Sequence, residues 1–220
     1  YVIAMTVEQC DLIYGVVYII LIENHVEALM GGHIMLPEYA KAINPALKDD
    51  DMMPATLSYE IMTGLLRDKL KFNGMVVTDA SHMVAMTNRM KRKDMLPLAI
   101  NAGCDMFLFF NDPEEDFGYM MEAYETGVIP EERMKEALTR ILGLKAHLKL
   151  HKKSQEELVP KAEVLEQKLG SSEALRVRKE IANCKRFDEI PEDAFVLFVT
   201  GGSQGAHSVN ELLSSACVIV

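Results

Sequence analysis

One aspartate, Asp79, stands at the end of a short apolar run and is the strongest candidate for chemistry in this sequence. Residues 73–83 read Asn-Gly-Met-Val-Val-Thr-Asp-Ala-Ser-His-Met. β-Branched residues between an Asn-Gly turn and a polar step predict a buried strand, with Asp79 at its C-terminal tip. In (β/α)₈ barrels the catalytic residues lie at this position. A structural role is also open, in which the carboxylate of Asp79 caps a helix that begins near Ser81.

The composition fits a globular domain and argues against two classes of partner. The 220 residues carry a net charge of −10, and 49% of them are apolar. An acidic chain is poorly suited to general nucleic-acid binding, which relies on basic surface to neutralise phosphates. The longest apolar run, residues 16–22, is too short to span a bilayer. We therefore expect neither nucleic acid nor membrane as a partner.

The four cysteines are scattered along the chain without a CxxC pair: Cys10, Cys104, Cys184 and Cys217. This spacing predicts neither a zinc site nor a disulfide framework. We expect free thiols in a reducing compartment, which favours a cytoplasmic protein. Nothing in the residue pattern indicates a metal or a cofactor.

Strands and helices alternate along residues 8–149. Strands are expected over residues 28–36, 75–79 and 103–110, and helices over residues 8–24, 58–71, 95–101, 113–126 and 131–149. The first helix is apolar nearly all round, as in a helix packed between other elements. Three prolines and an acidic run indicate a long surface loop over residues 37–55. The alternation predicts an α/β domain with a parallel sheet.

The pattern changes after residue 151. Residues 152–185 are charged and weakly patterned, as in a linker with one or two helices. Residues 194–200 then form a clear strand pattern that runs into a glycine-rich turn. We expect a first domain over residues 1–151, a helical linker over residues 152–185 and the start of a second α/β domain over residues 186–220.

Five stretches follow one another in a specific order. They are Val-Glu-Ala-Leu-Met-Gly-Gly-His-Ile at residues 26–34, Pro-Ala-Thr-Leu-Ser at residues 54–58, the segment 65–80 that ends in Val-Val-Thr-Asp-Ala, Ala-Gly-Cys-Asp-Met-Phe-Leu at residues 102–108, and the helix over residues 131–145. In order and spacing the chain resembles the second half of the barrel of family 3 glycoside hydrolases, in their β-N-acetylglucosaminidase and β-glucosidase branches. The resemblance implies the last strands of a (β/α)₈ TIM barrel.

By this resemblance, Asp79 is the nucleophile of a retaining glycosidase that acts on a terminal β-linked glucose or N-acetylglucosamine. A carboxylate can attack the anomeric carbon and later leave as an ester, so one difficult displacement becomes two easier ones. The resemblance also implies that His33 lines the sugar pocket, although a lone histidine beside glycines is more often structural. Asp105 and Arg67 resemble structural anchors, and His82 fits the turn after the strand.

A retaining mechanism needs a second acid about 5 Å from the nucleophile, and no segment of this sequence matches one. The resemblance implies an upstream Asp-His pair in one branch and a glutamate of a second domain in others. By element count the chain holds about three of the eight barrel strands. We therefore expect the missing strands to come from elsewhere, for example from a second chain, or the chain to be a partial product without turnover of its own.

Residues 201–206, Gly-Gly-Ser-Gln-Gly-Ala, allow other interpretations. They weakly resemble the phosphate-facing loop of UDP-N-acetylglucosamine glycosyltransferases, in which N–H groups at a helix start hold phosphates. They also fit the Gly-x-Ser-x-Gly motif of serine hydrolases, or a plain glycine turn. The alternatives to a glycosidase are thus a UDP-sugar glycosyltransferase and a non-catalytic remnant that binds sugar or a partner chain.

Overall fold

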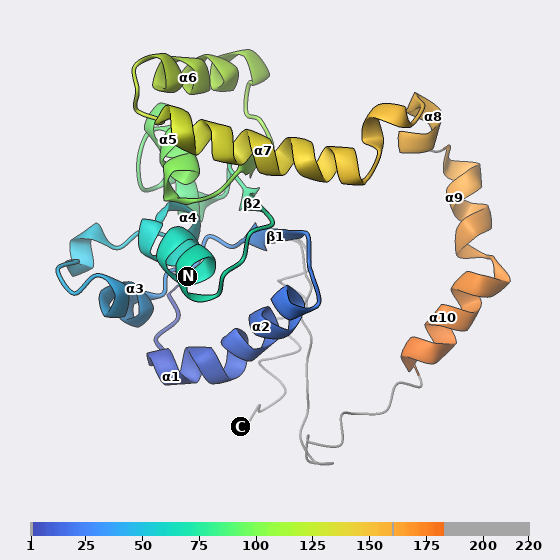
Figure 1. Cartoon of the computed structure of the whole chain (residues 1–220), viewed down its shortest axis with the longest axis horizontal. Coiled ribbons are helices and arrows are strands. Elements are labelled where there is room, and N and C mark those ends of the chain that lie inside the picture. The colour runs from blue at the N-terminus through green and yellow to red at the C-terminus, as the bar shows by residue number, and fades with distance from the viewer. Residues whose placement is uncertain (1, 160, 183–220) are drawn as a thin grey trace. The chain divides into compact units, whose positions relative to one another are not determined.

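Three parallel strands form the sheet in the described part of the chain. The computed structural model describes residues 2–159 and 161–182. The strands are β1 (Ala28–Gly31), β2 (Met75–Ala80) and β3 (Met106–Leu108), hydrogen-bonded in that order (Figure 1). The three predicted strands are confirmed, and β1 and β3 are shorter than expected. Parallel neighbours that are consecutive in the chain and joined by helices are the arrangement of successive barrel units.

Helices precede, connect and follow the strands. Before β1 lie α1 (Val7–Cys10), the π-helical η1 (Asp11–Gly15) and α2 (Val16–Glu23). Between β1 and β2 lie α3 (Pro37–Ile43), η2 (Asp49–Asp51), η3 (Ala55–Leu57) and the π-helical η4 (Glu60–Lys69). Between β2 and β3 lie α4 (Val84–Thr87) and α5 (Arg92–Ala102), and after β3 come α6 (Pro113–Glu125), α7 (Glu131–His147) and η5 (Leu150–Lys152). The predicted helices are confirmed, with shifted ends.

The prediction of one long loop over residues 37–55 is wrong at its start. Helix α3 begins with Pro37, and it buries Tyr39 and Ala40 against the core. Proline suits the first position of a helix, because the N–H that it lacks has no partner there and its φ is already helical. The prolines were interpreted as loop signals, whereas Pro37 initiates a helix.

The apolar segment formed by α1, η1 and α2 is helical as predicted but is not packed all round. Leu12 is 71% exposed and Ile20 is 53% exposed, while Cys10 on the other side is buried. Because this helical segment carries apolar side chains on all its sides, packing one side on the core leaves the apolar side chains of the other side uncovered by the described residues.

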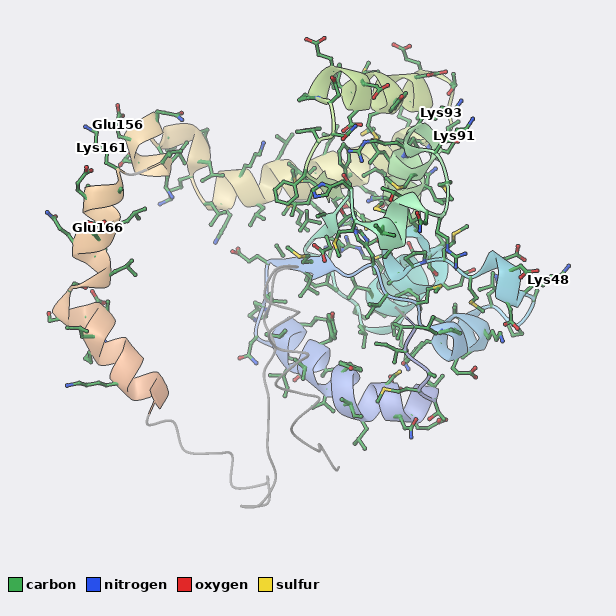
Figure 2. The ribbon with its side chains drawn as sticks, turned by 180° about the vertical axis from the view of Figure 1, so that it is seen from behind. Lys48, Lys91, Lys93, Glu156, Lys161 and Glu166 are labelled. Atoms are coloured by element: carbon green, nitrogen blue, oxygen red, sulfur yellow. The ribbon has the colours of Figure 1, made fainter. Side chains whose placement is uncertain are left out.

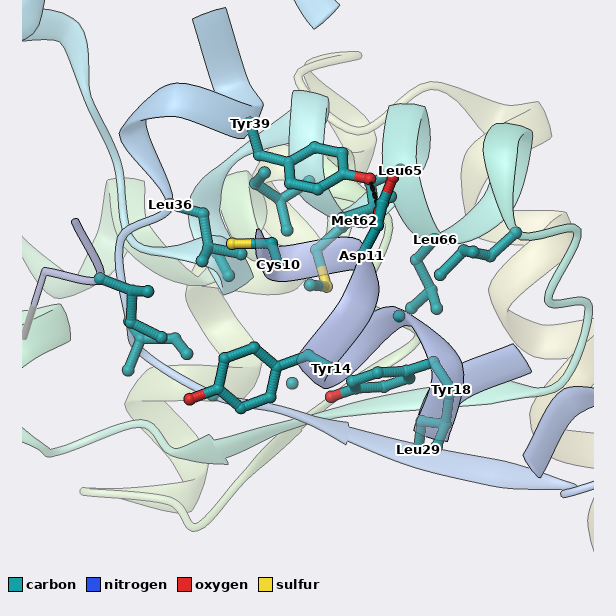
Figure 3. Close-up of a pocket in the computed structure, with 18 of the residues that line it drawn as sticks. Cys10, Asp11, Tyr14, Tyr18, Leu29, Leu36, Tyr39, Met62, Leu65 and Leu66 are labelled. Carbon is teal, nitrogen blue, oxygen red and sulfur yellow. Dashed lines mark hydrogen bonds between the residues drawn. The ribbon is translucent and has the colours of Figure 1, made fainter. Parts of the chain in front are cut away.

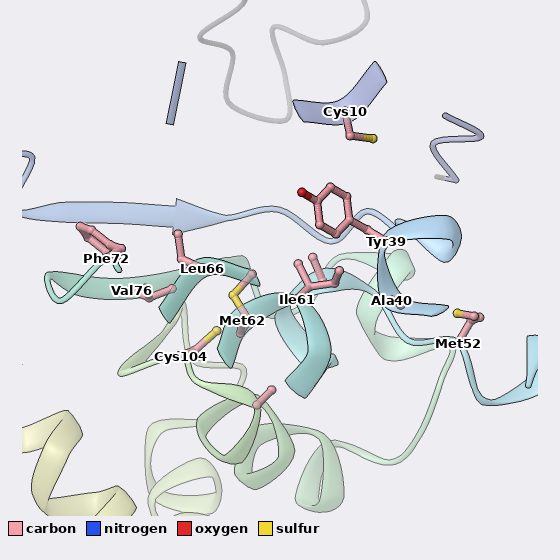
Figure 4. Packing of buried hydrophobic residues seen from close by; sticks show 12 residues of the cluster. Cys10, Tyr39, Ala40, Met52, Ile61, Met62, Leu66, Phe72, Val76 and Cys104 are labelled. Atoms are coloured by element: carbon pink, nitrogen blue, oxygen red, sulfur yellow. The ribbon is translucent and has the colours of Figure 1, made fainter. Parts of the chain in front are cut away.

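The largest core cluster fixes β2, the strand that carries Asp79. Val76 of β2 is fully buried, and Ile61, Met62 and Leu66 of η4 belong to the same cluster (Figure 4). Burial of such apolar surface is the main favourable contribution to folding. The helix-covered face of the sheet is therefore packed against η4. This packing fixes the position of the strand end that carries Asp79.

Gly103 occupies a position where both the backbone conformation and the surroundings oppose a side chain. Its φ is +129°, and an added Cβ would lie 2.9 Å from Thr63 Oγ1 and 3.2 Å from the carbonyl carbon of Met62. We expect Gly103→Ala to lower the free energy of unfolding by about 2 kcal/mol in urea titrations. Gly118→Ala is the matched control. It lies inside α6 with nothing within 4 Å of the added Cβ, so it should raise stability by about 0.5–1 kcal/mol.

The described residues from Ser154 to Ala182 belong to a unit separate from the one that ends at Lys153. Its described helices are α8 (Gln155–Leu158), α9 (Ala162–Leu169) and α10 (Ser172–Ala182). Charged side chains such as Glu156, Lys161 and Glu166 are exposed on it (Figure 2). The predicted strand over residues 194–200 and the glycine-rich residues 201–206 lie outside the described residues, and the three-segment division stays a prediction. Within the described ranges, no helix has the length and apolarity needed to cross a membrane.

Candidate active site

Asp79 lies at the C-terminal end of the central strand, on the face of the sheet that the helices leave open. In β2 the residues alternate between half-buried and buried, and Asp79 shares the half-buried side with Val77. Val77 pairs with Met30 of β1 and with Met106 of β3. Met30 is 55% exposed and Met106 is 37% exposed. In a (β/α)₈ barrel this row of side chains faces the barrel interior, and the residues at the C-terminal strand ends face the substrate.

The carboxylate of Asp79 makes a single hydrogen bond within the described part of the chain. The backbone N–H of Ala80 donates to Asp79 Oδ1 at 2.7 Å. No protein donor reaches Oδ2 in that part. One oxygen is therefore oriented by the backbone, and the other is available to a ligand. The alternative role of Asp79 as a cap for a following helix is not realised, because α4 begins only at Val84 and no N–H of that helix bonds to Asp79.

His33 joins the end of β1 to the residue after Asp79. Its imidazole is buried, with Nδ1 2.7 Å from Thr56 Oγ1 and Nε2 3.0 Å from the carbonyl oxygen of Ala80. A carbonyl can only accept, so Nε2 carries the proton and Nδ1 accepts from the hydroxyl of Thr56. Contact of His33 with a sugar stays a prediction, and it would require one of these two hydrogen bonds to be exchanged.

Burial lowers the pKa of His33 below 6.5, although the hydrogen bond to the Ala80 carbonyl and the nearby charge of Asp79 oppose the shift. The folded protein therefore binds this proton less readily than the unfolded chain does. The contribution of His33 to the free energy of unfolding should be fully present above pH 6.5 and should be lost as the pH drops from 6.5 toward the lowered pKa, by at most about 1.4 kcal/mol per pH unit.

His33→Gln removes this titration. We expect urea titrations of the two proteins between pH 8 and pH 5 to show that the free energy of unfolding falls more steeply toward acid pH in the wild type. Other groups contribute equally to both proteins. Parallel curves would mean that the imidazole protonates as easily in the folded protein as in the unfolded chain.

Arg92 at the start of α5 holds the loop that follows Asp79. Its Nη2 lies 3.0 Å from Ser81 Oγ, and its Nε and Nη2 contact the two carboxylate oxygens of Asp116 at 2.5 and 2.6 Å. Nothing in the sequence pattern marked Arg92 as a site residue. Its partners are 11 and 24 positions away in the chain, so no local pattern could have found it.

Asp105 and Arg67 form an anchor at the other end of the strands, as the sequence predicted. The side chain of Asp105 is fully buried and accepts from Arg67 at 2.7 Å, Arg133 at 2.7 Å and Arg140 at 3.2 Å. It also accepts from the backbone N–H of Val76 at 2.9 Å. This cluster ties η4 and α7 to the sheet, far along β2 from Asp79, so its role is structural. His82 lies in the turn after β2, which is also confirmed.

A cavity of about 140 Å³ lies between η1, α2, β1 and η4, and it is not the Asp79 site (Figure 3). Its wall is mostly apolar, and Asp79 is not part of it. Asp11, at one side, already accepts hydrogen bonds from Tyr39 and from Lys69. Because its carboxylate is already engaged by Tyr39 and Lys69 and its wall is otherwise mostly apolar, this cavity is a poorer candidate for glycoside chemistry than the strand end at Asp79.

Hydrogen bonds and ion pairs connect Asp79 to no second carboxyl group in the part of the chain that the structure describes. Nor do those residues include a cluster of three or more His, Cys, Asp or Glu side chains that could hold a metal ion. The candidate site is therefore one carboxylate at a strand end. The two residues that follow it, Ala80 and Ser81, are held by hydrogen bonds with His33 and Arg92.

Comparison with protein families and curated proteins gives one consistent result. The family model described as the N-terminal domain of glycosyl hydrolase family 3 matches residues 2–144. The beta-N-acetylglucosaminidase/beta-glucosidase of Cellulomonas fimi is 47% identical over 148 residues, which are 67% of this chain and 26% of that protein. Beta-hexosaminidase A of Pseudoalteromonas piscicida is 30% identical over 131 residues, which are 54% of this chain and 22% of that protein.

Solved structures agree with the sequence relatives. Beta-glucoside phosphorylase BglX bound to 2FGlc superposes with a TM-score of 0.73 at 38% identity, covering 82% of this chain and 32% of that one. The family 3 beta-N-acetylglucosaminidase from Paenibacillus sp. str. FPU-7 has a TM-score of 0.58 at 29% identity, covering 66% of this chain and 26% of that one. The predicted partial α/β barrel is confirmed. This chain spans between 22% and 32% of the length of these four proteins.

Proposed function

The chain belongs to glycosyl hydrolase family 3, and from this we propose that it carries the nucleophile of an enzyme that cleaves terminal β-glycosidic bonds. The proposed substrates are β-glucosides or β-N-acetylglucosaminides. One observation carries the proposal: Asp79 lies next to the C-terminal end of the central parallel strand, with one carboxylate oxygen free of protein hydrogen bonds in the described part of the chain. A carboxylate presented in this way can reach an anomeric carbon.

The proposed reaction is a double displacement at Asp79. An oxygen of its carboxylate attacks the anomeric carbon while the bond to the aglycone oxygen breaks and that oxygen receives a proton from an acid. This step gives a glycosyl ester and the free aglycone. Water, deprotonated by the same group, then attacks the anomeric carbon and releases the carboxylate, so the β-configuration is retained. The hydrogen bond from Ala80 N–H to Oδ1 orients the attacking Oδ2.

We place the acid, and the strands that close the barrel, outside the described residues. The exposed row formed by Met30 and Met106 supports this, because the interior row of a complete barrel is covered by opposite strands. A second chain is one source of these strands. Such strands would also protect the open sheet edges from non-specific pairing.

A trapping experiment tests the assignment of Asp79. An activated 2-fluoro glucoside, or an activated 5-fluoro analogue of N-acetylglucosamine that keeps the 2-acetamido group, is incubated with the protein, and the labelled peptide is identified by mass spectrometry. The fluorine slows both displacements, and a good leaving group restores the first, so the ester accumulates. We expect the label on Asp79. Label on another residue would reject the assignment, and a folded protein without label or turnover would favour the non-catalytic alternative.

Phosphorolysis is a second candidate, because two of the similar solved structures, at 38% and 33% identity, are beta-glucoside phosphorylases. In this reaction inorganic phosphate replaces water in the second displacement, and a sugar 1-phosphate is released. Both reactions use Asp79 in the same way. Product analysis with and without phosphate distinguishes them, since hydrolysis gives free sugar regardless of phosphate.

The UDP-sugar alternative rests on residues 201–206, which lie outside the described residues. It stays a prediction. Titration with UDP and UDP-N-acetylglucosamine tests it, because a glycosidase should show no dependence on a nucleotide.

A further inference from the structure

The two residues that follow Asp79 are fixed by contacts with two other segments, at His33 and at the end of β3. The Ala80 carbonyl accepts from His33, and the N–H of Ser81 donates to the carbonyl of Leu108 at 2.9 Å. The hydroxyl of Ser81 donates to the carbonyl of Phe109 at 2.7 Å. These contacts fix the backbone on the C-terminal side of Asp79. They therefore also fix the direction in which its side chain points.

Arg92 is the charged group at the centre of this arrangement. Its Nη2 donates to Ser81 Oγ at 3.0 Å and lies 3.4 Å from the Phe109 carbonyl, and its Nη1 lies 3.3 Å from the Ser81 carbonyl. One guanidinium thus binds the chain just after β2 and just after β3. Phe109 has a φ of +62°, which is a strained conformation for a bulky residue. The two donors on its carbonyl help to hold that conformation.

The guanidinium is itself held by a buried carboxylate. Asp116 of α6 is fully buried and contacts Arg92 through both oxygens, while the N–H of Asn111 donates to it at 3.0 Å. Burial alone would raise the pKa of Asp116, but the hydrogen bonds from Arg92 and Asn111 leave it below its ordinary value. The pair stays ionised at neutral pH and fixes the plane of the guanidinium.

We propose that Arg92 is a positioning residue for Asp79, acting through Ser81 and anchored by Asp116. This inference rests on the proposed function, because it assigns Arg92 to the geometry of the nucleophile. Arg92 itself does not touch the reacting atoms. An error of about 1 Å in the position of a reacting group can lower a rate by about 100-fold, so a residue that fixes this strand end has a kinetic effect.

Arg92→Lys tests the proposal, since lysine keeps the charge but lacks the planar fork that binds Ser81 and Asp116 together. With an aryl β-glycoside we expect kcat to fall about 100-fold while KM changes less than about two-fold. Arg89→Lys is the matched control. Arg89 donates to the carbonyl of Met52 at 2.8 Å and makes no contact with Ser81, so its replacement should leave kcat unchanged.

Amide hydrogen exchange gives a readout that does not depend on turnover. In Arg92→Lys we expect faster exchange over residues 76–82 and 106–111, and wild-type exchange over residues 60–72. A variant with wild-type kcat, or one that loses kcat without any change in exchange at the strand ends, would overturn the proposal. If the wild type turns over no glycoside even when the strands that close the barrel and the acid are supplied, while the variant still exchanges faster, the proposed function fails and Arg92 is only a structural anchor.

Asp116→Asn is the second variant, and it keeps the proposal testable if Arg92→Lys does not fold. It removes the charge that holds the guanidinium, so the same loss of kcat at similar KM is expected. Because both residues act in one network, the double variant should be no slower than the slower single variant. Independent, multiplying losses of kcat would show that Arg92 and Asp116 do not act through the same contact.

Discussion

Asp79→Asn should lower kcat by about 10⁴-fold or more on any glycoside that the wild-type protein cleaves, with little change in stability. The amide has nearly the shape of the carboxylate, and its oxygen can still accept the 2.7 Å hydrogen bond from Ala80 N–H. It lacks the negative charge needed to form a glycosyl ester. The measurement is kcat and KM with aryl β-glucosides and β-N-acetylglucosaminides, together with the free energy of unfolding.

Two further variants separate the loss of the nucleophile from a general loss of charge. Asp68→Asn removes an exposed carboxylate from η4, and it should leave kcat unchanged. Asp79→Ala opens space at the strand end, so added azide should attack the anomeric carbon and give a glycosyl azide of inverted configuration. Turnover of Asp79→Asn at the wild-type rate would remove Asp79 from the mechanism.

The parts of the site that local sequence determines were predictable. The strand that ends at Asp79 is encoded by its own β-branched residues and by the turn before it, and both are contiguous in the chain. Asp105 and Arg67 were recognised as anchors because they occur in stretches that resemble known barrels. Residues 37–43 were misassigned because proline indicates both loops and helix starts, and the choice depended on burial of Tyr39 in the folded protein.

The residues that hold the backbone beside Asp79, His33 and Arg92, could not be predicted in that role from the sequence alone. His33 reaches Thr56 and Ala80, which are 23 and 47 positions away. Arg92 meets Asp116 only because two helices that follow different strands lie side by side. Periodicity indicates which face of a helix is buried, but not which polar residue it meets there. Such pairs therefore become visible only in three dimensions.

Asp105→Asn should lower the free energy of unfolding by about 3–5 kcal/mol, the largest loss of stability that we expect from one substitution here. Asp105 is the buried carboxylate shared by Arg67, Arg133 and Arg140, whose side chains are only 11–19% exposed. Burial already lowers the pKa of Arg67, and repulsion from the other two arginines adds to this effect, whereas Asp105 opposes it. Asparagine would leave three crowded cations without their shared buried counter-charge and weaken the bond to Val76 N–H.

Urea titration with an unchanged m-value measures this loss, and Glu136→Gln is its control. Glu136 pairs with Arg133 at 3.1 Å, but its side chain is 59% exposed, so the exposed pair should contribute less than about 1 kcal/mol. Added salt should recover part of the stability of Asp105→Asn, because it screens the repulsion between the arginines. Equal effects of the two substitutions would mean that burial of Asp105 does not strengthen its ion pairs. A folded Asp105→Asn protein that retains kcat would separate this anchor at one end of the strands from the Asp79 chemistry at the other.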